Sequence, residues 1–163
     1  MSVVFPKAPD LNLQYSPIKK LVVDLNHANI LALSGSAIPL ITSQVPLIPV
    51  LIVLYPFIGT AYTGVDAAAR ILITDSSGDW LTTTVADDSG GGWTQVTDLL
   101  AGTAIITLNT SLNYITDEII GNPLTLATPY GIWINLINHA STLAGGIAGN
   151  KLRVMVYYVE LDV

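Results

Sequence analysis

The chain has 163 residues, of which 51% are hydrophobic and 11% are charged, whereas an average soluble domain is about 25% charged. Its formal net charge is −6 and its six Lys and Arg residues are scattered, which argues against direct binding to nucleic acid. The absence of cysteine excludes disulfide bonds and thiolate metal sites.

The length fits a single domain preceded by a short arm. Residues 1–18 are predicted to form an extended N-terminal arm, because their prolines disfavour a helix, and residues 19–163 to form a β-sandwich domain. The start lacks the basic and long apolar stretches of a secretory signal, so no signal peptide is expected. Apolar residues of the arm need a docking surface, and we expect three at a subunit interface: Val3, Val4 and Phe5.

Short β-rich segments separated by Gly, Pro, Asn and Asp follow the arm. Strands are predicted at 20–25, 30–33, 47–55, 70–74, 103–108, 123–127, 130–137 and 151–163, with turns or loops at 26–29, 34–36, 59–64, 75–78, 87–92 and 138–150. Residues 98–101 fit one helical turn, and 114–120 fit an edge strand or a short helix. Because no stretch has a sustained helical period, the predicted fold is all-β, a jelly-roll-like antiparallel β-sandwich.

The longest apolar run, residues 38–58, is the candidate for a membrane span. A spanning helix needs about 20 predominantly apolar residues, and proline inside a helix breaks it. Four prolines interrupt this run: Pro39, Pro46, Pro49 and Pro56. We therefore expect no membrane partner and interpret part of the run as a buried strand.

No motif for catalysis, a cofactor or a metal ion is visible. His27 and His139 lie in polar segments, and the spacing pairs neither with a second ligand or a catalytic partner. The loop at 87–92 lacks the alternating oxygen ligands of a calcium loop. Neighbouring acidic residues elsewhere have no defined separation across a cleft. We expect a protein that is not an enzyme and binds no cofactor.

The tryptophans allow a different kind of site. Trp93 follows Gly90–Gly92, whose residues are too small to bury it, so it is the best candidate for an exposed aromatic side chain. It is the candidate contact for a host glycan, and packing in the core or an interface is the alternative. Trp133 is flanked by Ile132 and Ile134 and is expected to be buried.

The closing segment, residues 151–163, is apolar on both alternating sides after Arg153. A strand in a two-layer antiparallel sandwich needs only one apolar side. Apolar residues on both sides therefore predict a central strand with a second surface to cover, most simply by another subunit. The interface residues expected here are Val154, Val156 and Tyr158.

Three segments, in this order, resemble parts of small structural proteins of tailed bacteriophages. They are the apolar run Leu47–Tyr55 with the loop Gly59–Gly64, then Asn122–Leu126, and then the ending Gly149–Tyr158. The resemblance covers residues 45–160. It implies a jelly-roll sandwich, usually a trimer, on the virion surface as a capsid decoration or cement protein, a head fibre or a tail component. It carries no catalytic residues to this chain.

Two hypotheses follow. The first is a non-enzymatic virion structural protein, a homotrimeric decoration or cement protein that binds the major capsid protein or other virion proteins and stabilises the phage head. The alternative is the head domain of a fibre, spike or tail protein that binds a host-surface glycan through Trp93 and its loop. The sequence contains no coiled-coil or repetitive stalk, which favours decoration. A glycan hydrolase has no supporting motif.

Overall fold

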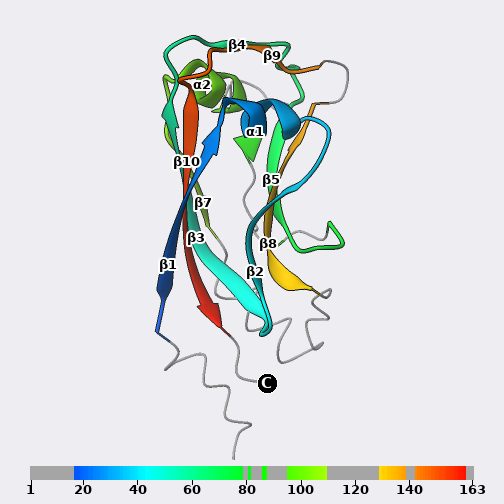
Figure 1. Ribbon diagram of the computed structural model, residues 1–163, viewed down its shortest axis with the longest axis vertical. Helices are drawn as coiled ribbons and strands as arrows, with labels where there is room; N and C mark the ends of the chain where they lie inside the picture. The colour runs from blue at the N-terminus through cyan, green and yellow to red at the C-terminus, as the bar shows by residue number, and fades with distance from the viewer. Residues whose placement is uncertain are drawn as a thin grey trace, which may run out of the picture.

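The computed structural model describes residues 17–78, 81, 86–87, 95–109, 129–138 and 142–160. Its elements are β1 (Lys19–Asn26), α1 (His27–Ala32), β2 (Ile38–Ser43), β3 (Leu47–Phe57), β4 (Tyr62–Thr63), β5 (Arg70–Thr74), β6 (Ala86–Asp87), α2 (Gln95–Ala101), β7 (Ile106–Asn109), β8 (Tyr130–Ile137), β9 (Ala144–Gly145) and β10 (Lys151–Glu160). They form two packed four-stranded sheets, with both helices and the β4–β9 ribbon at one end (Figure 1).

The strand order is β1-β10-β3-β7 in one sheet and β2-β8-β5-β6 in the other. Strands from the two ends of the chain pair with each other, progressively inward along the sequence. The pairs are β1 with β10, β2 with β8, β3 with β7 and β5 with β6, all antiparallel. Two more antiparallel pairs, β10 with β3 and β8 with β5, complete the sheets. Eight strands wound in this way make a jelly roll. The predicted all-β, jelly-roll-like sandwich is confirmed.

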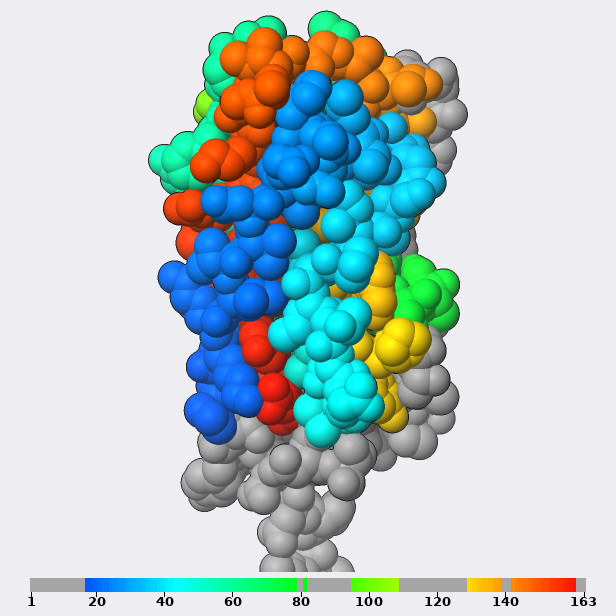
Figure 2. All heavy atoms as spheres, viewed as in Figure 1, coloured from blue at the N-terminus to red at the C-terminus, as the bar shows by residue number. Residues whose placement is uncertain are grey.

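One long edge of the sandwich is formed by β1 and β2, which come from different sheets. Figure 2 shows these two strands next to each other in blue and cyan, with part of β10 in red between them. At the end of the sandwich away from the helices, Lys19 at the start of β1 forms an ion pair of 2.5 Å with Glu160 at the end of β10. The described chain thus enters and leaves the fold at the same end.

The hydrophobic core lies between the two sheets. Along β10 the burial alternates, with Leu152, Val154 and Val156 fully buried and the residues between them half-buried. The other inward-facing strand residues without exposed surface include Ile52, Leu54, Ile73, Ile132 and Ile134. Burying each such side chain contributes on the order of 1.5 to 3 kcal/mol, so this inner layer supplies most of the driving force for folding.

The strand β3 contains two prolines, although proline cannot donate a hydrogen bond to a neighbouring strand. At Pro49 the register with β10 shifts, so that Val50 has no partner in β10. This β-bulge accommodates the missing donor. Pro56 lies beyond Leu51–Leu54, the part of β3 that pairs with β7. The two prolines therefore lie where the pairing of β3 with β10 is interrupted, or where β3 pairs with β10 but not with β7.

The segment 26–29 begins a helix and is not the polar break predicted from sequence. The Asn26 side chain accepts a hydrogen bond of 3.0 Å from the backbone N–H of Asn29, and the Asn29 side chain accepts one of 3.3 Å from the backbone N–H of Asn26. This reciprocal pair is a capping box made from two asparagines. The helix buries Ile30 completely. The strand predicted at 30–33 is therefore wrong.

Several predictions lie outside the described residues. Apart from Pro17 and Ile18, the predicted arm is among them, with its residues Val3, Val4 and Phe5. The segments 114–120 and 123–127 also lie outside. Within the part of the chain that the structure describes, neither helix is long and apolar enough to cross a membrane.

Candidate functional site

The predicted interface residues of the last strand belong to the core of a single chain. Val154 and Val156 have no exposed surface, and Tyr158 is 8% exposed. All three point between the two sheets, where the strands of the same chain already cover them. The predicted central position of β10 is confirmed, but these side chains leave no surface for a neighbour, so the predicted interface role does not fit their placement.

The opposite side of β10 faces away from the core, together with the outward sides of β1 and β3. We call this surface the aromatic face. It consists of Lys20, Val22, Asp24, Leu51, Val53, Tyr55, Phe57, Arg153, Met155 and Tyr157. Three of its apolar side chains are more than a third exposed, at 47% for Val22, 38% for Tyr55 and 44% for Phe57. The three strands β1, β3 and β10, which bury their inner side, thus still present a second apolar surface.

Two opposite charges on the aromatic face form an ion pair. Arg153 lies directly opposite Asp24 across β10 and β1, and its Nε and Nη2 donate hydrogen bonds of 2.7 and 2.9 Å to the two carboxylate oxygens. These hydrogen bonds from Arg153 lower the pKa of Asp24 below its ordinary value of 3.8. A bidentate pair of this kind fixes the guanidinium in one orientation.

The aromatic rings of this face contact one another and the nearby cations. The rings of Tyr55 and Phe57 lie 4.9 Å apart between centroids, on the same side of β3. The Arg153 guanidinium carbon lies 5.2 Å from the Phe57 ring centroid, and the Lys20 ammonium lies 5.4 Å from that of Tyr157. Cations at this distance from a ring are attracted to it. The result is an ordered surface of aromatic, apolar and arginine side chains.

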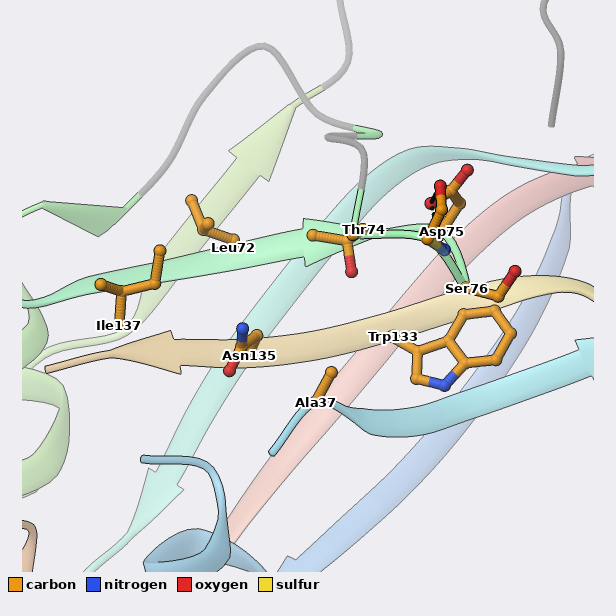
Figure 3. A pocket seen from close by; sticks show the side chains of 10 residues that line it. Ala37, Leu72, Thr74, Asp75, Ser76, Trp133, Asn135 and Ile137 are labelled. Carbon is orange, nitrogen blue, oxygen red and sulfur yellow. Dashed lines mark hydrogen bonds between the residues drawn. The ribbon is translucent and has the colours of Figure 1, made fainter. Parts of the chain in front are cut away.

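The outer side of the other sheet carries a pocket that the sequence did not predict. It has a volume of about 490 Å³ and lies over β5, β8 and the turn that follows β5 (Figure 3). Trp133 forms part of its wall, and its side chain is half-buried on the outer side of β8. The expectation that Trp133 is buried in the core is therefore wrong. Trp93, the predicted glycan contact, lies outside the described residues.

The turn beside this pocket is the one predicted at 75–78. The Asp75 carboxylate accepts hydrogen bonds from the backbone N–H and the hydroxyl of Ser77, both 2.8 Å long. A side chain that bonds to the backbone two residues ahead forms an Asx turn. Asp75 is 4% exposed, and its carboxylate stabilises the turn.

His27 has a structural environment at the helical end of the sandwich. Its Nδ1 lies 3.0 Å from the hydroxyl of Tyr62, and the two rings stack with centroids 5.7 Å apart. Burial raises the pKa of Tyr62. The buried Asn150 holds the adjacent loop by accepting a hydrogen bond of 2.9 Å from the Gly59 N–H and donating one of 2.7 Å to the Thr60 carbonyl. His139 lies outside the described residues.

No metal centre is formed by the described residues, which contain no group of three or more His, Asp or Glu side chains close enough to hold an ion. Two surfaces among the described residues are candidates for binding: the aromatic face and the pocket lined by Trp133. They lie on opposite sheets of the sandwich.

No protein-family model and no curated protein matches this chain. Among solved structures, a chain from the capsid of Ralstonia phage GP4 is similar over 100% of this chain and 93% of that chain, with 15% sequence identity and a TM-score of 0.45. At this score and identity the similarity establishes neither a common fold nor a common function.

Proposed function

We propose that this chain is a non-enzymatic virion structural protein, a homotrimeric decoration or cement protein on the head of a tailed bacteriophage. The observation that carries the proposal is the aromatic face. Soluble monomers rarely expose contiguous apolar patches, and larger ones mark interaction sites. In this proposal the aromatic face of each subunit is covered by a neighbouring copy.

The composition of the face fits a protein partner. Tyrosine, phenylalanine, methionine and arginine are enriched where proteins meet, and aromatic and arginine side chains dominate binding energies. The exposed rings of Tyr55 and Phe57 beside Arg153 supply such anchors. Since Arg153 is already paired with Asp24, a partner can cover it without leaving a buried charge unpaired.

The sequence resemblance supports the same region. Two of the three similar segments, Leu47–Tyr55 and Gly149–Tyr158, contain most of β3 and β10, which are neighbours in one sheet. The outward sides of these two strands make up most of the aromatic face. The resemblance implies a trimer and a position on the virion surface, where the major capsid protein or its neighbours are the further partners.

A three-fold ring needs two different surfaces on each subunit, because its contacts run head to tail. We propose the arm residues Val3, Val4 and Phe5 of one copy as the second surface, docked on the aromatic face of the next. The chain enters β1 from the arm at the end of the sandwich where Lys19 pairs with Glu160. The arm therefore joins the fold beside the sheet that carries the aromatic face.

Multi-angle light scattering of the full chain at micromolar concentration tests this proposal. We expect a mass of three times 17.3 kDa. The substitution Phe5→Asp should convert the trimer to monomers and leave the circular dichroism spectrum unchanged, and Ser2→Asp is the matched control outside the apolar set. A stable wild-type monomer would contradict the proposal.

The place on the particle needs a separate measurement. A low-resolution map of virions that carry this chain should show three copies around three-fold positions of the head surface. Density for the chain on the tail alone would contradict the decoration role and leave the structural role intact.

A further inference from the structure

We infer that the pocket beside Trp133 binds one neutral sugar unit, with the indole ring as its platform and Thr74 and Asn135 as its hydrogen-bonding groups. The pocket volume of about 490 Å³ falls in the range of small-molecule sites. This inference does not depend on the proposed function, because the pocket lies on the sheet opposite the aromatic face.

The indole ring is held in place by the strand beneath it. Gly131 precedes Trp133 by two residues, so both point to the outer side of β8. A Cβ atom at Gly131 would lie 2.9 and 3.0 Å from two ring carbons of Trp133 and 2.2 Å from the Ile41 carbonyl oxygen. The glycine thus lets the ring lie close over the backbone. A platform fixed before binding loses little freedom when a ligand stacks on it.

The Thr74 hydroxyl is the strongest sign that a ligand is missing. Thr74 is 2% exposed, lines the pocket, and its Oγ1 has no hydrogen-bond partner in the described structure. Buried polar atoms are nearly always paired, because an unpaired one has lost its water and gained nothing in return. A hydroxyl group of a ligand in the pocket would supply the missing partner.

Asn135 provides a second polar group at a suitable distance. It lies two residues beyond Trp133 on the same side of β8, while Thr74 is directly opposite Trp133 on β5. Diagonal neighbours on one side of a sheet lie about 7 to 8 Å apart, which a sugar ring with its hydroxyl groups can bridge. The three side chains share one side of the β5–β8 pair (Figure 3), and no hydrogen bond of the Asn135 amide is found among the described residues.

The chemistry of the lining favours a neutral sugar over other ligands. A sugar ring has an apolar C–H face that stacks on an indole and hydroxyl edges that donate and accept hydrogen bonds. None of the described lining residues is Lys, Arg or His, so an anion finds no counter-charge. Trp133 is the lone aromatic residue of that lining, whereas grooves for proline-rich peptides are lined by several.

Nuclear magnetic resonance of the isotope-labelled full chain tests the inference. The probes are the methyl glycosides of glucose, galactose, mannose and N-acetylglucosamine, added to millimolar concentration. At least one should shift the indole N–H signal of Trp133 and the side-chain amide signal of Asn135. Sodium sulfate at the same concentration should not.

Variants separate binding from folding. Thr74→Val keeps the shape of the side chain and removes the hydroxyl, so it should weaken glycoside binding roughly fivefold while the melting temperature stays equal or rises. If the Thr74 hydroxyl served only to stabilise the fold, Thr74→Val would lower the melting temperature. Trp133→Ala should abolish binding, and Ile147→Ala, at an exposed side chain outside the pocket lining, should leave it unchanged. If Trp133→Ala does not fold, Thr74→Val carries the test.

Three results would overturn the inference. The first is that no glycoside of the four shifts the Trp133 signal. The second is binding that Thr74→Val leaves at full strength. The third is a stronger response to sulfate or to a proline-rich peptide than to any glycoside, which would assign the pocket to an anion or to a peptide.

Discussion

The two outer faces of the sandwich differ in whether one central polar side chain has a hydrogen-bond partner. On the aromatic face, Arg153 is bonded to Asp24 and Lys20 lies over the ring of Tyr157. On the other sheet, the Thr74 hydroxyl is buried without a partner and faces a pocket. At these two positions, the pairing of polar groups distinguishes the two surfaces.

The physical reason lies in what each surface must lose on binding. A broad protein contact removes water from every group that it covers, and an unpaired charge in such a contact is costly. On the aromatic face, Arg153 and Asp24 meet this requirement in advance. A small ligand instead gains from groups that still need a partner, and the Trp133 pocket offers these.

The largest effect is expected at Gly131, which seats the platform of the pocket. Gly131→Ala places a methyl group 2.2 Å from the Ile41 carbonyl oxygen and against the ring of Trp133. Overpacking of this kind should lower the free energy of unfolding by about 3 kcal/mol, measured by chemical denaturation. Gly149→Ala is the control, since a Cβ there meets nothing within 4 Å. Equal stability of the two variants would show that Trp133 is not held by close packing.

The next effect concerns association through the aromatic face. Truncating an aromatic anchor costs about 2 kcal/mol of binding, so Tyr55→Ala and Phe57→Ala should each weaken the proposed trimer by more than tenfold in sedimentation equilibrium. Ile147→Ala is the control, since that side chain is 48% exposed but lies outside the face. Unchanged association of both aromatic variants would place the subunit contact elsewhere.

The smallest effect is expected on the pH dependence of stability, through the Asp24–Arg153 pair of the aromatic face. The pKa of Asp24 is lower in the folded chain than its ordinary value of 3.8, because Arg153 bonds to the carboxylate. The resulting stability is present above that ordinary value and is lost as the pH falls through the lowered pKa. Melting temperatures between about pH 5 and about pH 2 should therefore fall more steeply for the wild type than for Asp24→Asn.

Arg153→Gln is the matching control for this pH dependence, because it removes the same hydrogen bonds from the other side. Its melting temperature should fall less steeply with decreasing pH than that of the wild type, as for Asp24→Asn. A slope identical to the wild type in both variants would show that the pair contributes nothing to stability at acid pH.

Much of the fold follows from continuous or alternating apolar runs. Residues 70–74 and 130–137 were predictable as strands to the residue, because each is an apolar run between turn signals. The helix α1 was not, since two asparagines cap it and it has only six residues, too few to show a period. The strand β2 was missed because Pro39 near its start suggests a break, and an edge strand tolerates it.

The sites were less predictable, because each depends on which side of a strand meets the second sheet. Alternation along β10 separates two sets of residues without saying which set faces inward. Lys151 and Arg153 share their side with Met155 and Tyr157, and these two charges are the signal that this side faces outward. The Trp133 pocket combines side chains of β5 and β8, which lie about sixty residues apart in the chain. No local sequence pattern therefore reveals it.

The pairing of first strand with last has a consequence for synthesis. On the ribosome β1 emerges long before β10, yet β10 lies between β1 and β3 and joins them into one sheet. Until β10 leaves the exit tunnel, the nascent chain must keep its early strands apart from those of other nascent chains. Folding dominated by such distant pairings is slow, so production of this protein should depend on chaperones and on the rate of translation.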